Sequence, residues 1–325
     1  MAIDLLSIEP HKVSKDLSGY ITYIYGAGKT GKTTLASQME DALLVAFEKG
    51  YNAIPGIMSI DVATWGEFKQ VVRELKKSEV KEKYKCIVID TVDIASALCE
   101  KYVCSQNDVE KLGDIPYGGG WALVKKEFEE SFRTITQQGY ALFFISHAKD
   151  KVFKREDGTE YNQTVPSLAN TYNEIVKNMA DIYGYAHQVR TESGTTVLPT
   201  LRSADGSVDT GCRFKYIQPE IPFTYQALTE ALHAAIDKEA ELTNNQYITT
   251  ERATIAPTVQ ERDFTEIMSE FQAIAKALMD RDAGNSAVIT STAEKYLGKG
   301  KKVFECNEKQ GELIELIIND LKPLV

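Results

Sequence analysis

The sequence lacks the features that mark secreted and membrane proteins. Only 5 of its 325 residues are cysteine, none of them in a CxxC pair, and no apolar run approaches the roughly 18 residues of a membrane span. The first ten residues include Asp4 and Glu9 and no basic stretch, so we expect neither a signal peptide nor a membrane anchor. An odd, scattered set of cysteines favours reduced thiols and a cytoplasmic location over a disulfide framework or a zinc site.

The sequence also has fewer basic than acidic residues. Lys and Arg number 37 against 47 Asp and Glu, which gives a net charge of −10. This balance argues against binding nucleic acid through bulk charge, so any such contact needs a local basic face or loops shared across an oligomer. The apolar fraction of 43% and the charged fraction of 26% are those of a globular chain, and the length predicts about two domains.

Short apolar runs alternate with segments that have apolar residues at helical spacing. The runs predict strands at residues 20–25, 43–47, 86–89 and 140–145, and the spaced segments predict helices at residues 33–39, 62–75, 94–103 and 121–135. This alternation indicates an α/β fold, with a mainly parallel sheet and helices on both of its faces.

The pattern changes in the second half of the chain. Residues 182–190 and 196–202 flank Glu192-Ser193-Gly194 and predict an antiparallel hairpin. The polar, Thr-rich segment 243–262 predicts a linker. Further helices are predicted at residues 169–181, 225–241, 264–278, 287–297 and 310–321. We therefore expect one domain at 1–242, a linker at 243–262, and a small helical C-terminal domain at 263–325.

Residues 26–33, Gly-Ala-Gly-Lys-Thr-Gly-Lys-Thr, match G-x-x-x-x-G-K-[ST] between a predicted strand and a predicted helix. Gly26 and Gly31 let the backbone fold around an anion, and the start of the helix adds its dipole. Lys32 is expected to reach the β- and γ-phosphates, and the Thr33 hydroxyl to bind Mg²⁺. The alternative is a glycine turn with an incidental lysine. We predict an ATP site formed by Gly26, Ala27, Gly28, Lys29, Thr30, Gly31, Lys32, Thr33 and Thr34.

Polar side chains end three other predicted strands. Asp90 is expected to hold the metal with Thr33; the alternatives are that it caps the next helix or that Asp93 takes the metal role. Glu48 lies on the sheet edge that faces ligands, where it can activate the attacking water. His147 can sense the γ-phosphate. The alternatives are an ordinary surface glutamate and a histidine that is hydrogen-bonded at the sheet edge.

We call residues 26–34 the phosphate cradle. Along the chain the cradle is followed by Glu48, Asp90, the polar strand end at His147 and the predicted hairpin, and this order resembles the RecA-like ATPase core. Residues 13–20, Val-Ser-Lys-Asp-Leu-Ser-Gly-Tyr, which lead to the cradle, look like the phage nucleotide-binding ATPases of that P-loop superfamily, some of them described as RecA-like single-strand annealing proteins. The resemblance covers about residues 8–240. It implies Mg²⁺-dependent ATP hydrolysis in a homo-oligomer, either a ring or a filament. His147 stands where the family has a sensor glutamine.

The resemblance also implies two loops that hold single-stranded DNA. The first corresponds to residues 112–121, whose glycines favour mobility and whose Tyr117 and Trp121 offer stacking faces, unless Trp121 is buried at the start of the next helix. The second corresponds to residues 148–167, which turn at Asp157-Gly158 and could equally be a solvated hairpin. The basic residues of this second segment are Lys149, Lys151, Lys154 and Arg155.

A basic finger from a neighbouring subunit completes the site in related ATPases. The resemblance implies this role for Arg213, which would stabilise charge on the transferred phosphoryl group. The C-terminal run at 295–302 carries four lysines and two glycines that could grip a phosphate backbone, although a solvated loop is the simpler interpretation.

These features together predict a phage ATPase in the host cytosol that acts on single-stranded DNA in recombination or annealing, with DNA-stimulated hydrolysis. The alternative is a nucleotide-dependent assembly module that recruits a single-strand-binding or replication protein without touching DNA. A helicase-like motor is a third possibility, for which the sequence has no motif set beyond the shared core.

Overall fold

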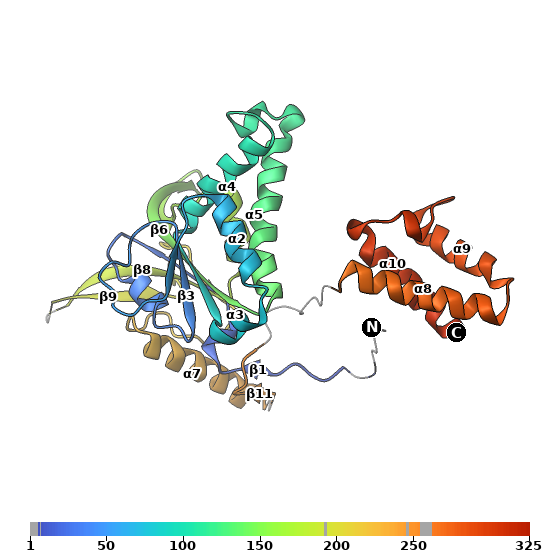
Figure 1. Cartoon of the computed structure of the whole chain (residues 1–325). Coiled ribbons are helices and arrows are strands. Elements are labelled where there is room, and N and C mark those ends of the chain that lie inside the picture. Colours follow the sequence, from blue (N-terminus) through green and yellow to red (C-terminus); the bar gives the residue numbers. More distant parts are fainter. Residues whose placement is uncertain (1–5, 7, 192–193, 245–246, 254–261) are drawn as a thin grey trace. The chain divides into compact units, whose positions relative to one another are not determined.

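A computed structural model describes residues 6, 8–191, 194–244, 247–253 and 262–325 (Figure 1). The described chain divides into two compact units. One lies within Pro10–Thr258, and the other lies within Val259–Val325 together with Met1–Glu9. Each unit has its own hydrophobic core.

The sheet of the larger unit contains nine strands in the part of the chain that the structure describes (Figure 1). These are Thr22–Gly26 (β2), Ala42–Ala46 (β3), Ser59–Asp61 (β4), Cys86–Asp90 (β5), Ala141–Lys154 (β6), Glu160–Pro166 (β7), Ile182–Thr191 (β8), Gly194–Thr200 (β9) and Gly211–Cys212 (β10). The order is β10-β8-β2-β6-β5-β3-β4, with parallel pairing from β8 to β4. Strands β7, β9 and β10 pair antiparallel with β6, β8 and β8. The predicted α/β fold is confirmed. The short strand β4 was not predicted, and residues 192–193 of the predicted turn lie outside the described residues.

Helices cover both faces of this sheet. Lys32–Ala36 (α1) and Tyr225–Thr243 (α7) pack on one face, and Trp65–Glu74 (α2), Val92–Gln106 (α4), Gly119–Gln137 (α5) and Asn170–Met179 (α6) pack on the other. Ser78–Lys83 (α3) is a short connection before β5. In β5, Ile87 and Ile89 enter the core under α2, α4 and α5, whereas Cys86 and Val88 enter the core under α1 and α7. Burial on both faces explains why this strand is continuously apolar in sequence.

Helices α4 and α5 extend beyond the sheet as an arm (Figure 1). Its tip contains two 3₁₀ turns, Leu112–Asp114 and Pro116–Gly118, where the sequence predicted a mobile loop. Helix α4 starts two residues after Asp90 and has 15 residues, so the tip lies about 22 Å along the helix from that strand end. Trp121 lies in the first turn of α5, as the alternative interpretation expected, but its side chain is 54% exposed rather than buried.

Part of the predicted linker belongs to the larger unit. Ile248–Thr249 (β11) pairs in parallel with Val13–Ser14 (β1). The guanidinium of Arg252 donates to the carbonyl oxygens of Ser18 (3.1 Å), Gly139 (2.9 Å) and Lys85 (2.9 Å). These carbonyls precede β2, β6 and β5, so one side chain ties the returning segment to the starts of three strands. The prediction of a linker is therefore wrong for residues 248–252, while residues 254–261 lie outside the described part.

The smaller unit contains three helices in its described residues: Phe264–Arg281 (α8), Asn285–Leu297 (α9) and Gly311–Leu321 (α10). Their apolar faces meet in a core that includes Ile274, Leu278, Ile314 and Ile317. None of the described helices in either unit combines the length and the apolar character that crossing a membrane requires.

Replacing Arg252 tests how far the returning segment stabilises the larger unit. We expect Arg252→Ala to lower the free energy of unfolding by about 2–4 kcal/mol, because three carbonyls lose a charged donor. Arg133→Ala is the matched control: its guanidinium forms an exposed pair with Glu129, worth about 0.5 kcal/mol. Urea denaturation of the full chain measures both changes, and equal losses in the two variants would contradict this role for Arg252.

Candidate functional site

The phosphate-binding segment follows β2 and begins α1. Gly26 ends β2, and a Cβ at this position would lie 2.3 Å from the carbonyl oxygen of Ala186 in β8. Gly31 precedes α1 with a φ of +85°, a backbone conformation that favours glycine. The hydroxyl of Thr30 donates to the carbonyl oxygen of Ala27 (3.0 Å) and closes the turn. Both motif glycines are thus required by backbone geometry, one by close approach and the other by its positive φ.

The ammonium of Lys32 lies within this cradle. Its Nζ donates to the carbonyl oxygens of Gly26 (2.9 Å) and Ala27 (2.7 Å), and the side chain is buried. Burial lowers the pKa of Lys32, while the carboxylates of Asp90 and Glu48 act in the opposite direction. These two carboxylates and that of Asp93 therefore lie close enough to the ammonium to influence its ionisation.

Asp90 connects the cradle to the neighbouring strand ends. The Thr33 hydroxyl donates to Oδ2 of Asp90 (2.7 Å), and the Asp90 carboxylate is buried at the end of β5. The backbone carbonyl of Asp90 accepts from the N–H groups of Phe47 (2.7 Å) and Glu48 (3.3 Å), just after β3. Burial raises the pKa of Asp90; the hydrogen bond from Thr33 opposes this shift, and Glu48 adds to it.

The Thr33 hydroxyl and the Asp90 carboxylate suit a magnesium ion that is held jointly by protein and nucleotide. Two oxygen groups are too few for an ion held by protein ligands alone. Mg²⁺ in nucleotide sites takes one or two protein oxygens and completes its octahedron with phosphate and water. Thr33 and Asp90 supply a hydroxyl and a carboxylate 2.7 Å apart beside the cradle. Among the described residues, no cluster of three or more His, Cys, Asp and Glu side chains could hold a metal without a nucleotide.

Glu48 and His147 meet on the same sheet edge. His147 Nε2 lies 3.6 Å from Glu48 Oε1, and both side chains are partly exposed. The parallel register pairs His147 in β6 with Gly26, the first residue of the cradle. The structure therefore brings together Lys32, Thr33, Glu48, Asp90 and His147, although the chemical role of each stays a prediction.

The sequence analysis missed an anchor behind this edge. Asp93, in the first turn of α4, accepts hydrogen bonds from the hydroxyl of Ser167 and from the backbone N–H of His147 (3.3 Å). The N–H of Ser167 in turn donates to the carbonyl oxygen of His147 (2.8 Å). Both carboxylate oxygens of Asp93 are engaged, which does not favour its alternative role as metal ligand. Ser167 follows β7 and has no motif that could have identified it.

The second predicted DNA segment forms the β6–β7 hairpin. Alternation along β6 puts Lys149, Lys151 and Phe153 on one face, and Arg155 Cζ lies 4.7 Å from the ring centroid of Tyr161. The Lys151 ammonium lies 4.9 Å from the centroid of Phe153, whose ring stacks with Tyr161 at 5.7 Å. The two aromatic residues were missed by the sequence analysis. Lys154 instead lies on the opposite face, 3.7 Å from Glu160.

Arg213 lies at the other end of the sheet from the cradle. Its guanidinium contacts Asp181 Oδ1 (3.3 Å) and donates to the carbonyl oxygen of Asn178 (3.0 Å), beside the start of β8. The cradle begins about four residues, roughly 13 Å, further along the paired strand β2. Arg213 therefore cannot complete the site of its own chain, and a catalytic role requires a neighbouring chain.

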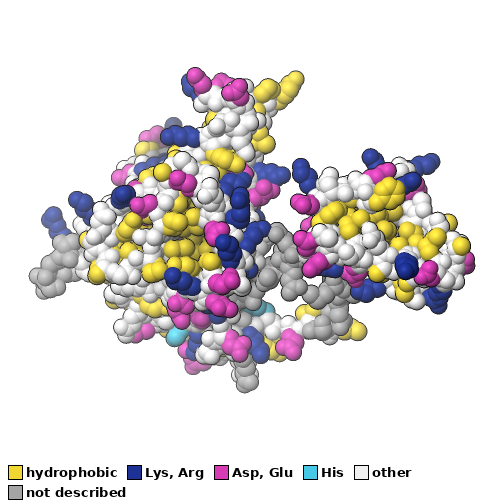
Figure 2. Space-filling model, viewed as in Figure 1, with side chains coloured by type: hydrophobic (Ala, Val, Ile, Leu, Met, Phe, Trp, Pro, Cys, Tyr) yellow, Lys and Arg dark blue, Asp and Glu magenta, His cyan; other side chains and the backbone are white. Residues whose placement is uncertain are grey.

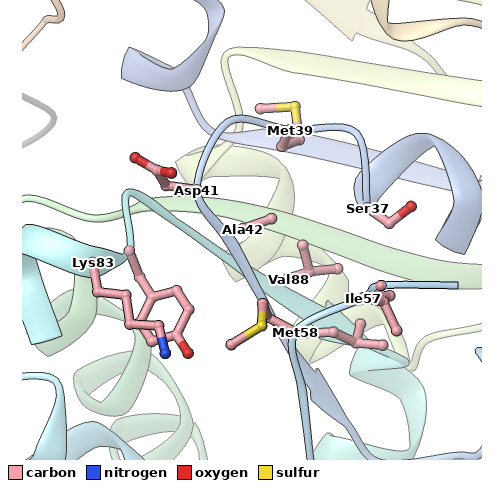
Figure 3. A pocket seen from close by; sticks show the side chains of 11 residues that line it. Ser37, Met39, Asp41, Ala42, Ile57, Met58, Lys83 and Val88 are labelled. Atoms are coloured by element: carbon pink, nitrogen blue, oxygen red, sulfur yellow. The ribbon is translucent and has the colours of Figure 1, made fainter.

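A separate pocket of about 370 Å³ lies near the amino ends of β3 and β5 (Figure 3). Met39, Ile57, Met58 and Val88 give it an apolar lining, and Lys83 lies at its edge. Ligands of parallel sheets bind at the carboxyl ends of the strands, so this pocket is not part of the phosphate-binding edge.

A family model described as an AAA domain matches residues 18–220. The chain belongs to this family. The match includes the cradle, Asp90 and His147, and it ends after β10. As an AAA domain, the larger unit is a nucleotide-binding ATPase domain of the P-loop class, which confirms the corresponding part of the sequence prediction.

One relative is similar to this chain along the whole length of both proteins. The SPbeta prophage-derived uncharacterized protein YorG of Bacillus subtilis (strain 168) is 30% identical over 338 residues, which cover 100% of this chain and 99% of that protein. The flagellar accessory protein FlaH of Methanocaldococcus jannaschii is 11% identical, with a TM-score of 0.32 over 63% of this chain and 84% of that chain. A KaiC-like protein of Pyrococcus horikoshii OT3 is 12% identical, with a TM-score of 0.36 over 65% and 94%. Similarity this weak to two solved structures gives no information about what this chain binds.

Because the pKa of Asp90 is raised in the folded protein, we expect the ionised Asp90 carboxylate to lower the free energy of unfolding. A carboxyl group whose pKa is higher in the folded than in the unfolded state destabilises the fold when it is ionised. We expect Asp90→Asn to raise the Tm of the nucleotide-free protein at neutral pH by a few degrees, since about 1 kcal/mol corresponds to about 2–4 °C at this size. The gain should shrink as the pH falls through the folded-state pKa of Asp90.

Asp93→Asn is the matched control for this thermal denaturation. It replaces one of two engaged carboxylate oxygens by an NH₂ group, which cannot accept a hydrogen bond, so we expect it to lower the Tm. A lower Tm for Asp90→Asn at neutral pH, or a gain that does not depend on pH, would contradict the assigned electrostatic cost.

Proposed function

We propose that the chain binds ATP and Mg²⁺ at residues 26–34 and hydrolyses ATP. The hydrogen bond between Thr33 and Asp90 carries this proposal, because it joins the two expected metal ligands beside the ammonium of Lys32. Glu48 activates the attacking water as general base. His147, 3.6 Å from Glu48, reports the γ-phosphate to the root of the β6–β7 hairpin.

We further propose that this ATPase acts on single-stranded DNA in recombination or annealing. The support is the basic and aromatic face of the β6–β7 hairpin, where Lys151, Phe153 and Tyr161 combine cations with stacking rings. Hydrolysis then switches this hairpin between holding and releasing DNA. Lys149 and Arg155 add local positive charge to this face, Lys154 adds charge on the opposite face beside Glu160, and Tyr117 and Trp121 add a second stacking contact at the arm tip.

A nucleotide-dependent interaction module is the second candidate function, and the arm favours it. The tip exposes Tyr117 fully and Trp121 by half. Acidic side chains outnumber basic ones on it (Figure 2): Asp108, Glu110 and Asp114 are exposed beside a single lysine, Lys111. Carboxylates repel phosphates, so this tip suits a protein partner better than a DNA backbone. In this function ATP drives assembly, and a single-strand-binding or replication protein docks on the oligomer.

The prophage-derived relative supports a proposal for the cellular setting. We propose that this chain is a phage protein of the bacterial host cytosol, since YorG is prophage-derived and 30% identical along the whole chain. The chain assembles into a ring or filament, in which each cradle receives a basic residue from the next copy.

The ATPase rate with and without single-stranded DNA tests the proposed function. Stimulation by DNA supports the DNA-acting ATPase, and a DNA-independent rate supports the interaction module. Glu48→Gln should retain ATP binding and lose about 10²–10⁴-fold in turnover, because the amide cannot accept the proton from water. Lys32→Ala should lose ATP affinity, measured by calorimetry. Undiminished ATP affinity in Lys32→Ala would contradict the assignment of the cradle.

A mixing experiment tests Arg213 as a residue that acts in the neighbouring chain. Arg213→Ala and Lys32→Ala should each be nearly inactive alone. An equal mixture should regain activity, because about a quarter of the interfaces in a random assembly join an intact cradle to an intact Arg213. Circular dichroism controls for folding, since Arg213 also contacts Asp181. No recovery from two folded variants would exclude the role in trans.

A further inference from the structure

A basic loop in the smaller unit has no role in the function proposed so far. Residues 298–302 connect α9 to the 3₁₀ turn Val303–Glu305, and we refer to residues 298–304 as the lysine loop. The loop exposes the side chains of Lys299, Lys301, Lys302 and Phe304. It therefore concentrates positive charge and an aromatic ring within a chain whose net charge is −10.

The backbone of the lysine loop is held in one conformation. Gly298 and Gly300 have φ values of +96° and +78°, and the N–H of Gly300 donates to Glu294 Oε1 (2.8 Å). The N–H of Lys301 donates to the carbonyl oxygen of Gly298 (3.1 Å), and Val303 is buried in the core of the unit. A surface that is ordered before binding loses little conformational entropy when a ligand binds.

The ammonium groups of the lysine loop are available to an anionic ligand. Within the described residues, Lys299, Lys301 and Lys302 form no ion pair, whereas Lys295 at the end of α9 is 2.7 Å from Asp320. Three such cations on a short stretch can each neutralise one phosphate of a nucleic acid chain. An isolated carboxylate ligand would not need three.

Phe304 distinguishes a nucleic acid from other anionic ligands. Its side chain is 72% exposed because the preceding residue, Val303, takes the buried position. The Lys302 ammonium lies 5.4 Å from the centroid of the Phe304 ring. Unpaired bases stack on exposed aromatic rings while neighbouring cations follow the backbone, which is the combination found in sites for single strands. A duplex offers no unpaired base to such a ring.

We propose that the lysine loop binds single-stranded DNA, with its three lysines on phosphates and Phe304 stacked on a base, independently of ATP. The proposal rests on the proposed function for its choice of nucleic acid. It gives the smaller unit a role of its own: retaining the strand while the β6–β7 hairpin releases it during hydrolysis.

Fluorescence anisotropy of the full chain with an oligothymidylate of about 30 nucleotides tests this site. All variants carry Lys32→Ala, so ATP plays no part. Replacing the three lysines by glutamine should reduce the slope of log affinity against log salt by about 2, since each phosphate contact on a single strand contributes about 0.7. Lys276→Gln, at an exposed position of α8, is the control and should leave the slope unchanged.

Variants of Phe304 test the stacking contact in the same assay. Phe304→Ala should weaken binding about 5- to 150-fold, corresponding to about 1–3 kcal/mol. Phe304→Trp should retain affinity, and Phe304→Leu, which keeps apolar area but no ring face, should behave like Phe304→Ala. Full affinity in Phe304→Leu would overturn stacking, and a protein partner would then be the better explanation of the exposed ring.

The outcomes separate this inference from the proposed function. Unchanged affinity and salt slope in the lysine-loop variants, with binding by the parent protein intact, would overturn the inference and leave DNA binding by the hairpin standing. Loss of binding in those variants, with an ATPase rate that does not respond to DNA, would support the inference and contradict DNA-coupled hydrolysis. No binding by the parent protein would overturn both.

Discussion

The hydrogen bond between Thr33 and Asp90 is the interaction on which the candidate site depends. It joins the start of α1 to the end of β5, which are separated by 57 residues in sequence. The backbone carbonyl of the same aspartate holds the end of β3, and with it Glu48. Its carboxylate is buried near the ammonium of Lys32, and because burial raises the pKa of Asp90, ionising this carboxylate costs folding free energy. Such a cost to folding is typical of functional sites rather than of packing.

The parts of this molecule that could be predicted from sequence are those with local signals. A buried strand is a continuous apolar run, and the cradle is a contiguous motif, so β2, β3, β5, β6 and residues 26–34 were identifiable. Arg252 and the pair Asp93–Ser167 were not, because their partners lie between 74 and 234 residues away in the chain. Nothing in the Thr-rich segment around Arg252 indicates that its guanidinium meets three carbonyls that precede strands of the sheet.

Charge in this protein is arranged by position rather than by total. The net charge of −10 suggested little affinity for nucleic acid, yet the lysines of the β6–β7 hairpin and of residues 298–304 are each grouped with exposed or partly exposed rings. The arm tip has aromatic side chains among carboxylates instead. Since screening limits electrostatic attraction to about 10 Å at moderate salt, these local groupings decide binding more than the overall charge does.

Asp93 connects the β6–β7 hairpin and the arm, the two parts of the structure on which the two candidate functions rely. Its carboxylate fixes the root of the β6–β7 hairpin through Ser167, and its helix, α4, continues into the arm. The same carboxylate accepts from the backbone of His147, whose side chain faces Glu48 across 3.6 Å. If His147 senses the nucleotide as proposed, its movement would act on the hairpin and on α4 through this one carboxylate. A ligand shifts a conformational equilibrium only through different affinities for its two states. DNA on the hairpin and a protein on the arm would then bias the same equilibrium, so each would alter the affinity of the cradle for ATP without any contact between them.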